Sequence, residues 1–371
     1  MLTYLDLAKL NHSVALGRKL EQLFYSDMIS KHSKGEFTKL IFVVDSNVMK
    51  KVKKYLIYFK TSKIIPFDVL TLNVNESIKN VKELESYIYL LKKMGTDRKS
   101  LMVIFGGGIL SDTFGFIASI FMRGIPWIVF PTSLLSMVDS SVGGKVAMNV
   151  GQIKNYIGVI NLPQAIYCDL DFLKSLSKND YTAGLSEVYK YAMINDETLL
   201  QFMHKNWDKI LKRDPFLLKI IERSVFTKYD FIKDDLLEKE SGKRRFLNFG
   251  HTFGHALESI THHKISHGHA IWWGILFMIH IFYQKSVISE NEFMLFLNFY
   301  ERVPLANFKI KLDPKKIYEI MQSDKKSANA KIRFVAIKKI GQIDMKWQEY
   351  SDKLIYDSVA FINKYQKERF S

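Results

Sequence analysis

Cysteine is almost absent from this chain, since Cys168 is the only one among 371 residues. One cysteine cannot form a disulfide within the chain, which excludes the class of small secreted domains held together by disulfides. The N-terminal segment also lacks a basic stretch followed by an apolar core and a small-residue cleavage site, so we expect no signal peptide. Both absences are typical of a cytoplasmic protein.

Long hydrophobic runs are missing as well. The most apolar run extends from Ala270 to Tyr283 and contains His280. It is too short to cross a bilayer, which takes about 20 apolar residues, so it predicts a buried helix and no membrane partner.

Acidic residues are outnumbered, because 38 Asp and Glu face 54 Lys and Arg and leave a net charge of +16. Such an excess can attract nucleic acid, an anionic membrane or an anionic substrate. The lysines are scattered, and no basic segment with interleaved aromatic residues stands out. We therefore expect no nucleic-acid partner, an expectation that steep salt-dependent retention on DNA would overturn.

The order of apolar runs predicts two domains, as the length of the chain also does. Five short runs alternate with helical patterns in the first half, which predicts a parallel sheet covered by helices. The runs are Leu40–Asp45, Phe67–Val74, Leu101–Gly108, Trp127–Ser133 and Gln164–Asp171. Helical patterns dominate after about Lys174. We place an α/β domain at residues 1–176 and a mostly α-helical domain at 177–371, with a cleft between them.

Two strand ends carry candidate cofactor contacts. Gly106, Gly107 and Gly108 precede an expected helix, whose backbone N–H groups suit a phosphate or pyrophosphate. Ser111 stands where a dinucleotide fingerprint has its third glycine, so a tight structural turn is the alternative. Asp45 at the end of its strand fits either ribose binding or a helix N-cap.

A polar segment at residues 130–158 is the densest of its kind. It contains Asp139, Lys145, Asn149, Lys154 and Asn155. Cationic and amide groups gathered in one loop are suited to a phosphorylated, carboxylated small-molecule substrate. A solvated surface loop is the alternative, although residues 131–138 are too apolar for one.

Histidine spacing raises the question of a metal. His251 and His255 are four residues apart and share a helix face, but Thr252 stands where a zinc-protease helix has glutamate. With Glu187 and His267, His251 would complete three protein ligands and an open position, as in catalytic zinc sites. An ion pair of Glu187 with Lys190, and ordinary structural histidines, are the alternatives.

Seven segments resemble the 3-dehydroquinate synthase family of sugar-phosphate cyclases in order and spacing, over roughly Leu40 to Ile340. They are "GGGILSDTFGF", "RGIPWIVFPTSLLSMVDSSVGGK", "KNYIG", "CDLDFLKSL", "GLSEVYKY", "RRFLNFGHTFGHALE" and "SHG". The resemblance implies a Rossmann-like NAD-binding N-terminal domain and a helical C-terminal domain for metal and substrate. It also implies NAD, one divalent metal (usually zinc, with cobalt possible) and a homodimer.

The resemblance also implies roles for individual residues. The metal ligands are Glu187, His251 and His267. The cofactor contacts are Asp45, Asn47, Glu76, Lys79, Gly106, Gly107, Gly108, Asp112, Thr132, Ser133, Asp139, Lys145 and Lys154. The catalytic residues are His255, Lys190, Lys145, Arg123 and Asp139. The substrate contacts are Lys154, Asn155, Lys228, Arg244, Asn248 and a late lysine, Lys325 or Lys326.

The implied reaction converts 3-deoxy-arabino-heptulosonate 7-phosphate into 3-dehydroquinate and phosphate, with transient oxidation by NAD, elimination, re-reduction and an internal aldol closure. The chain departs from the family at Val150, Ile153 and His269, near the substrate loop and the metal. Another sugar-phosphate cyclase is therefore the alternative, followed by a metal- and NAD-dependent alcohol dehydrogenase. For His269 we hypothesise an influence on metal affinity.

Overall fold

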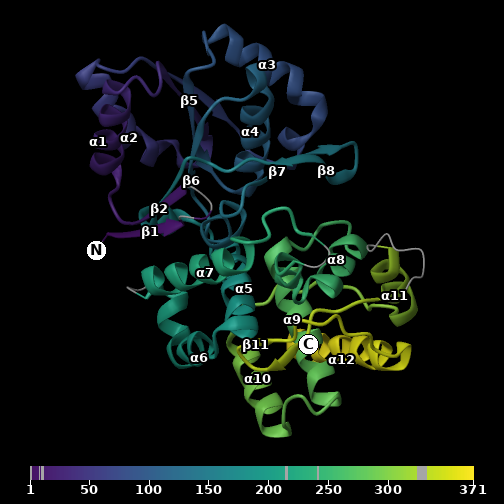
Figure 1. The fold of residues 1–371 in the computed structure, drawn as a ribbon. Helices are drawn as coiled ribbons and strands as arrows, with labels where there is room; N and C mark the ends of the chain where they lie inside the picture. Colours follow the sequence, from purple (N-terminus) through teal and green to yellow (C-terminus); the bar gives the residue numbers. More distant parts are fainter. Residues whose placement is uncertain (1, 8, 10–11, 214–215, 240–241, 324–331) are drawn as a thin grey trace. The chain divides into compact units, whose positions relative to one another are not determined.

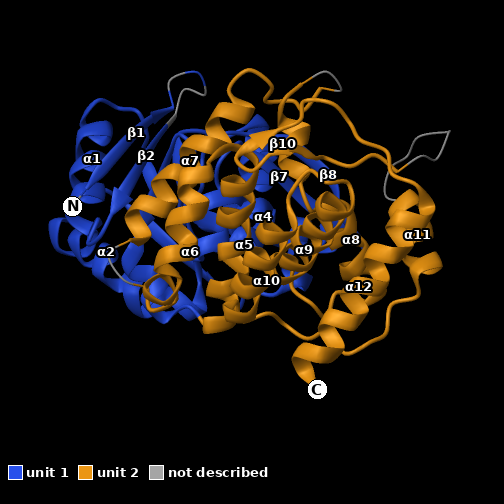
Figure 2. Cartoon of the chain, turned by 90° about the horizontal axis from the view of Figure 1, so that it is seen from below, with its two compact units in different colours: residues 1–176 blue, residues 177–371 orange. Residues whose placement is uncertain are grey.

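The computed structural model describes the chain except residues 1, 8, 10–11, 214–215, 240–241 and 324–331. The chain divides into two compact units, Met1–Leu176 and Ser177–Ser371 (Figure 2). Each unit is described by itself.

Unit 1 is built around a seven-stranded sheet with the order β1-β2-β9-β6-β5-β3-β4. All neighbours pair in parallel except β1 and β2. The strands are β1 (Thr3–Leu7), β2 (His12–Gly17), β3 (Lys39–Asp45), β4 (Phe67–Leu72), β5 (Ser100–Gly106), β6 (Trp127–Pro131) and β9 (Ala165–Asp169). The five predicted runs form the parallel strands from β9 to β4, so the predicted fold class is confirmed for this unit. The antiparallel edge strand β1 and its neighbour β2 lie outside the predicted runs.

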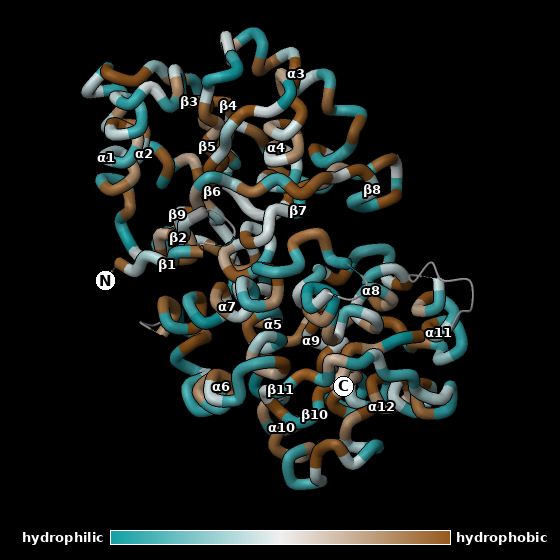
Figure 3. The backbone as a smooth tube through the Cα atoms, viewed as in Figure 1, coloured by the Kyte–Doolittle hydropathy of each residue, from teal (hydrophilic) through white to brown (hydrophobic). Residues whose placement is uncertain are grey.

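Helices cover both faces of this sheet (Figure 1). They are α1 (Glu21–Ser33), α2 (Met49–Ser62), α3 (Leu84–Lys93) and α4 (Gly108–Ile120). Alternate residues of β3, such as Leu40, Phe42 and Val44, join α1 and α2 in one core. The residues between them, Ile41 and Val43, are buried on the other face. Burial on both faces explains why these strands are continuous apolar runs, which Figure 3 shows as brown segments.

A separate hairpin joins β7 (Lys145–Val150) to β8 (Ile153–Ile160) in antiparallel register. The sequence analysis treated this stretch as a polar loop. The prediction of a loop is therefore wrong for these residues, because β7 buries Val146, Met148 and Asn149 and provides a strand with which the exposed β8 pairs. β7 packs on α4, whereas β8 is exposed along most of its length.

Unit 2 is mostly helical, as predicted. Its helices are α5 (Lys178–Asn195), α6 (Glu197–Leu211), α7 (Leu217–Ile232), α8 (His251–Ile260), α9 (His267–Gln284), α10 (Glu290–Arg302), α11 (Pro314–Ser323) and α12 (Asp352–Phe370). A short hairpin of β10 (Ile337–Lys339) and β11 (Gln342–Ile343) completes it. The apolar run predicted as a buried helix is α9, in which Gly268 to Phe282 are all buried. Among the described residues, no helix has the length and apolar character needed to cross a membrane.

Two glycines let α9 lie unusually close to its neighbours. A Cβ atom on Gly274 would lie 2.0 Å from the carbonyl oxygen of Gly250, just before α8. A Cβ atom on Gly268 would lie 2.1 Å from the carbonyl oxygen of Ala183 in α5. Only glycine fits such approaches. They bring the amino-terminal ends of α8 and α9 next to the middle of α5.

The buried His280 of α9 predicts a loss of stability in mild acid. Its side chain is 7% exposed, and its Nδ1 lies 3.0 Å from the hydroxyl of Ser358. Burial lowers the pKa of His280 to about 4, against which Asp357 acts only in part. The unfolded chain, with a histidine pKa of about 6.5, therefore binds more protons between these values, and stability falls as pH falls through them.

From this imbalance we expect the free energy of unfolding to drop by about 2 kcal/mol between pH 7 and pH 5 because of His280. Urea denaturation followed by tryptophan fluorescence measures it, since four of the five tryptophans lie in unit 2. His280→Gln should flatten this pH dependence, whereas the exposed His263→Gln should leave it unchanged. An equal slope in all three proteins would refute the assignment.

Candidate metal and catalytic site

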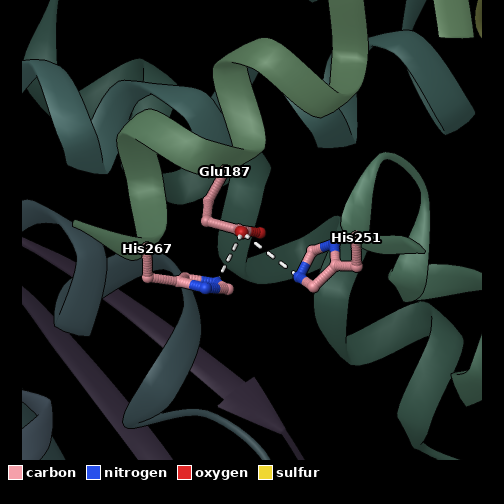
Figure 4. Close-up of side chains that lie close together, drawn as sticks. All are labelled: Glu187, His251 and His267. Atoms are coloured by element: carbon pink, nitrogen blue, oxygen red, sulfur yellow. Dashed lines mark ion pairs between the residues drawn. The ribbon is translucent and has the colours of Figure 1, made fainter. Parts of the chain in front are cut away.

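Three side chains from three helices of unit 2 meet in a group that could hold a metal ion. Glu187 comes from the middle of α5, while His251 and His267 are the first residues of α8 and α9. The Oε1 atom of Glu187 lies 3.6 Å from Nε2 of His251 and 3.7 Å from Nε2 of His267 (Figure 4). One donor atom from each residue lies within 4.8 Å of the others.

The local backbone aims both imidazoles at Glu187. Gly250 adopts φ +77° immediately before α8, a conformation that favours glycine. His251 Nδ1 lies 3.0 Å from the carbonyl oxygen of Phe249. A carbonyl only accepts, so Nδ1 carries the proton and Nε2 presents its lone pair toward Glu187.

The second imidazole is oriented by a carboxylate. His267 Nδ1 lies 3.2 Å from Oε2 of Glu258, so Nδ1 donates and Nε2 is left to face Glu187. A histidine that ligates a metal commonly donates its other nitrogen to a carboxylate or a carbonyl. One carboxylate oxygen and two imidazole nitrogens form a donor set suited to zinc or a similar divalent ion. The residues present therefore fit such an ion.

The two histidines have opposite protonation tendencies in the metal-free chain. Burial, and then the positive charge of Lys190, lower the pKa of His251 well below its usual range. Burial also acts to lower the pKa of His267, but hydrogen bonds to Glu187 and Glu258 outweigh it and raise the pKa to about 10. A metal at His267 would thus displace a proton at neutral pH.

Lys190 forms a buried ion pair with Glu187 one turn earlier on α5. Both side chains are almost inaccessible, with Glu187 0% and Lys190 1% exposed. The intrahelical ion pair considered as an alternative is therefore present, and it coexists with the histidine group. Its ammonium also lies 4.7 Å from the centre of the Tyr191 ring.

His255 lies one turn after His251 on α8. Its ring centre is 5.4 Å from that of His251 and 6.0 Å from that of His267. His255, Glu258 and His267 form a second group whose donor atoms lie within 4.8 Å of one another. Of the two histidines four residues apart, only His251 therefore belongs to the Glu187 group.

The other residues expected at the substrate in unit 2 lie on α7 and just before α8. Arg244 is buried. Its backbone N–H donates to Asp235 Oδ2 at 2.9 Å, and its guanidinium donates to the carbonyl oxygen of Leu236. Asn248 donates to Glu238 Oε1 at 3.3 Å. Lys228 is buried on α7, which packs on the turn containing Arg244. Lys325 and Lys326 lie outside the described residues.

His269, for which we hypothesised an influence on metal affinity, is not a member of the group of Glu187, His251 and His267. His269 is 1% exposed, and its Nδ1 accepts a hydrogen bond from the N–H of Ala306 at 3.3 Å. This contact ties α9 to the segment after α10. It gives His269 a partner that is not a member of the group of Glu187, His251 and His267.

In unit 1, the residues expected at the cofactor gather beyond the carboxyl ends of β3, β4, β5 and β6, where ligands of parallel sheets bind. Asp45 accepts from the N–H of Asn47 at 2.9 Å, so the N-cap alternative is present. Gly106 ends β5, and α4 begins at Gly108. Thr132 and Ser133 follow β6 directly.

A short 3₁₀ helix after β4, Glu76–Lys79, contributes two more of these residues. Lys79 Nζ lies 2.5 Å from Oδ2 of Asp112 on α4, and this ion pair is largely buried. Glu76 Oε1 lies 3.9 Å from Nζ of Lys154 on β8. Unit 1 therefore brings Lys154, an expected substrate contact, next to Glu76, an expected cofactor contact.

The remaining expected residues of unit 1 are more dispersed. Asp139 lies in the π-helix Ser136–Ser140, and Lys145 begins β7. Arg123 follows the carboxyl end of α4, whereas Gly106–Gly108 lie at its amino end. Because a 13-residue helix is about 20 Å long, Arg123 lies about that far from the glycines, beyond the opposite end of α4. Within unit 1 the structure does not bring it together with the others.

Glu258 was missed by the sequence analysis, although its spacing offered a signal. It follows His251 by seven and His255 by three residues, so all three share one face of α8.

We expect Glu258→Gln to weaken zinc binding about 10- to 100-fold, because the imidazole of His267 loses its charged acceptor. Competition titration with a chelating dye measures the zinc dissociation constant. The exposed Glu319→Gln on α11 is the matched control, and equal affinity in both variants would contradict the expectation.

Comparison with solved structures defines the class of fold. A 2-deoxy-scyllo-inosose synthase complexed with carbaglucose-6-phosphate, NAD⁺ and Co²⁺ matches with a TM-score of 0.82 and 22% identity, over 97% of this chain and 99% of that one. The 2-epi-5-epi-valiolone synthase of Streptomyces hygroscopicus, with NAD⁺ and Zn²⁺ bound, has a TM-score of 0.82 at 18% identity, over 95% and 97% of the two chains. A glycerol dehydrogenase from Schizosaccharomyces pombe is less similar, with a TM-score of 0.63 at 15% identity, over 96% and 90%. The chain therefore has the fold of these synthases.

Sequence similarity identifies the family within that class. The family model of the 3-dehydroquinate synthase N-terminal domain matches residues 69–183, and that of the C-terminal domain matches 184–327. A 3-dehydroquinate synthase of Prochlorococcus marinus is 37% identical over 297 residues, covering 79% of this chain and 81% of the relative. One of Dictyoglomus turgidum is 38% identical over 294 residues, covering 78% and 81%. The chain belongs to the 3-dehydroquinate synthase family, which confirms the resemblance.

Proposed function

We propose that this protein converts 3-deoxy-arabino-heptulosonate 7-phosphate into 3-dehydroquinate and phosphate. The observation that carries the proposal is the group of Glu187, His251 and His267 with His255 beside it, in a chain of this family. We further propose that residues 1–176 bind NAD and that residues 177–371 bind the metal and most of the substrate. A homodimer in the cytoplasm is part of the same proposal.

Glu187, His251 and His267 would hold one divalent ion, zinc or cobalt, whose Lewis acidity polarises the hydroxyl oxygens of a bound substrate. The turns after β3, β4, β5 and β6 would hold NAD as a reversible hydride acceptor. The contacts proposed for it are Asp45, Asn47, Glu76, Lys79, Gly106, Gly107, Gly108, Asp112, Thr132, Ser133, Asp139, Lys145 and Lys154. Two of these residues, Lys79 and Asp112, form a largely buried ion pair that would hold both side chains in place.

Proton transfer is assigned to His255. The centre of its ring lies 5.4 Å from that of His251 and 6.0 Å from that of His267, and the imidazole would accept the proton of the C5 hydroxyl. Lys190 would orient the substrate beside Glu187, and Asp139 completes the catalytic residues that we propose. Arg123 would join them only from a second copy of the chain in the proposed homodimer, because it lies at the opposite end of α4 from the glycines.

Anion binding is assigned to the cationic and amide side chains. Lys145, Lys154, Asn155, Lys228 and Arg244 would bind the phosphate and the carboxylate, since bidentate and point-charge contacts suit these groups. Asn248 and a late lysine, Lys325 or Lys326, would complete the pocket.

A different sugar-phosphate cyclase is the second candidate, because Val150 and Ile153 depart from the family beside Lys154. The test supplies zinc-loaded protein and NAD with heptulosonate phosphate or with sedoheptulose 7-phosphate in parallel, and follows phosphate release. We expect release from the heptulosonate phosphate only. Release from sedoheptulose 7-phosphate alone would transfer the assignment to the second candidate.

A further inference from the structure

Asn149, near the end of β7, uses both ends of its side-chain amide. Its Nδ2 donates to Oε1 of Glu76 at 2.8 Å, and its Oδ1 accepts from the backbone N–H of Asn155 at 2.8 Å. The side chain is 5% exposed, so water does not compete freely for these contacts. Asn149 thereby joins the 3₁₀ helix that contains Glu76 to the strand that contains Lys154 and Asn155.

The backbone around Asn149 is held by further contacts. Asn149 forms an isolated parallel bridge with Asn80, directly after the 3₁₀ helix. The side chain of Asn80 donates to the carbonyl oxygen of Gly151 at 3.1 Å, which anchors the turn between β7 and β8. Asn155 adopts φ +51°, a left-handed conformation that few residues other than glycine and asparagine adopt readily. The hydrogen bond from its N–H to Asn149 holds Asn155 in that conformation.

We propose that Asn149 is a positioning residue that links the cofactor contact Glu76 to the substrate contacts Lys154 and Asn155. This inference rests on the proposed function, which supplies the roles of the three linked residues. An amide suits the position because it offers one donor toward a carboxylate and one acceptor toward a backbone N–H. The Lys154 ammonium, 3.9 Å from the same oxygen of Glu76, completes the arrangement. NAD affinity and substrate affinity then depend on one buried side chain.

Two substitutions separate the two halves of this link. Asn149→Asp keeps an acceptor for the N–H of Asn155 but places a carboxylate oxygen against Glu76. We expect the NAD dissociation constant to rise about 10- to 100-fold, since a hydrogen bond to a charged group is replaced by repulsion. The KM for heptulosonate phosphate should change by less than about threefold because the acceptor remains. Asn149→Ala removes both contacts, so both constants should rise.

A reversed pair tests the contact itself. Glu76→Gln combined with Asn149→Asp restores one donor and one acceptor with the opposite polarity. We expect the double variant to bind NAD within about threefold of Glu76→Gln alone, which a general disturbance of the fold would not produce. The NAD dissociation constant is measured by titration calorimetry, KM by phosphate release, and folding by thermal melting.

Asn298→Asp, exposed on α10, is the matched control and should leave both constants unchanged. The inference is overturned if Asn149→Asp binds NAD as the wild type does. It is also overturned if the double variant Glu76→Gln, Asn149→Asp binds NAD much more weakly than Glu76→Gln alone. If Asn149→Ala does not fold, the reversed pair still decides the question. A wild-type protein that neither binds NAD nor releases phosphate would instead refute the proposed function, so the two failures are distinguishable.

Discussion

Replacing Glu187 by Gln is expected to abolish tight zinc binding and to lower kcat for dehydroquinate formation by about 10³-fold. The carboxylate is the anionic member of the donor set and lies 3.6 and 3.7 Å from the two imidazole nitrogens. A neutral amide is a much weaker ligand for a divalent ion. Zinc content after dialysis and steady-state phosphate release measure the two effects.

The buried neighbour of Glu187 supplies the control for this experiment. Lys190→Met removes the adjacent charge but keeps all three donors, so this variant should still bind zinc. In Glu187→Gln the Lys190 ammonium loses its buried counter-charge, which costs about 3–5 kcal/mol of stability. The double variant Glu187→Gln, Lys190→Met should regain stability without regaining zinc. Tight zinc binding by Glu187→Gln would remove Glu187 from the ligand set.

Replacing His255 by Gln is expected to lower kcat by about 10²- to 10⁴-fold, the range typical of losing a general acid or base. Glutamine preserves the approximate size of the side chain but cannot accept a proton near neutral pH. Zinc binding should persist, because His255 is not part of the Glu187 group. The measurement is kcat as a function of pH alongside zinc content.

His263→Gln is the matched control, since this exposed histidine lies just beyond the end of α8. It should retain the activity and the pH profile of the wild type. If His255→Gln loses zinc together with activity, His255 acts as a ligand and its assignment to proton transfer is wrong.

Much of the fold was predictable because burial leaves a simple pattern. The parallel strands β3, β5 and β6 are buried along nearly their whole length, so each appears in the sequence as a continuous apolar run. The helix α9 appears in the same way, since its whole middle is buried. The hairpin of β7 and β8 was not predictable from such a pattern. β8 is exposed on both faces, and its pairing depends on a partner rather than on periodicity.

The candidate site was predictable to a different degree. The sequence supplied Glu187, His251 and His267 as a possible set, but only the packing of α9 on α5 and α8 brings them together. Glu258 and Asn149 act through other side chains, and no local pattern indicates which groups they contact. The position of Arg123 depends on the direction in which α4 runs along the face of the sheet, which residue spacing does not encode.

In the proposed reaction the chain closes a carbocycle with NAD as a recycled cofactor rather than as a consumed oxidant. The most direct measurement incubates zinc-loaded protein with heptulosonate phosphate and a catalytic amount of NAD, and follows phosphate, dehydroquinate and NADH together. We predict many turnovers per NAD, with equal amounts of phosphate and dehydroquinate and no net NADH. Accumulation of NADH in proportion to substrate, with no phosphate released, would refute this reaction and indicate an alcohol dehydrogenase.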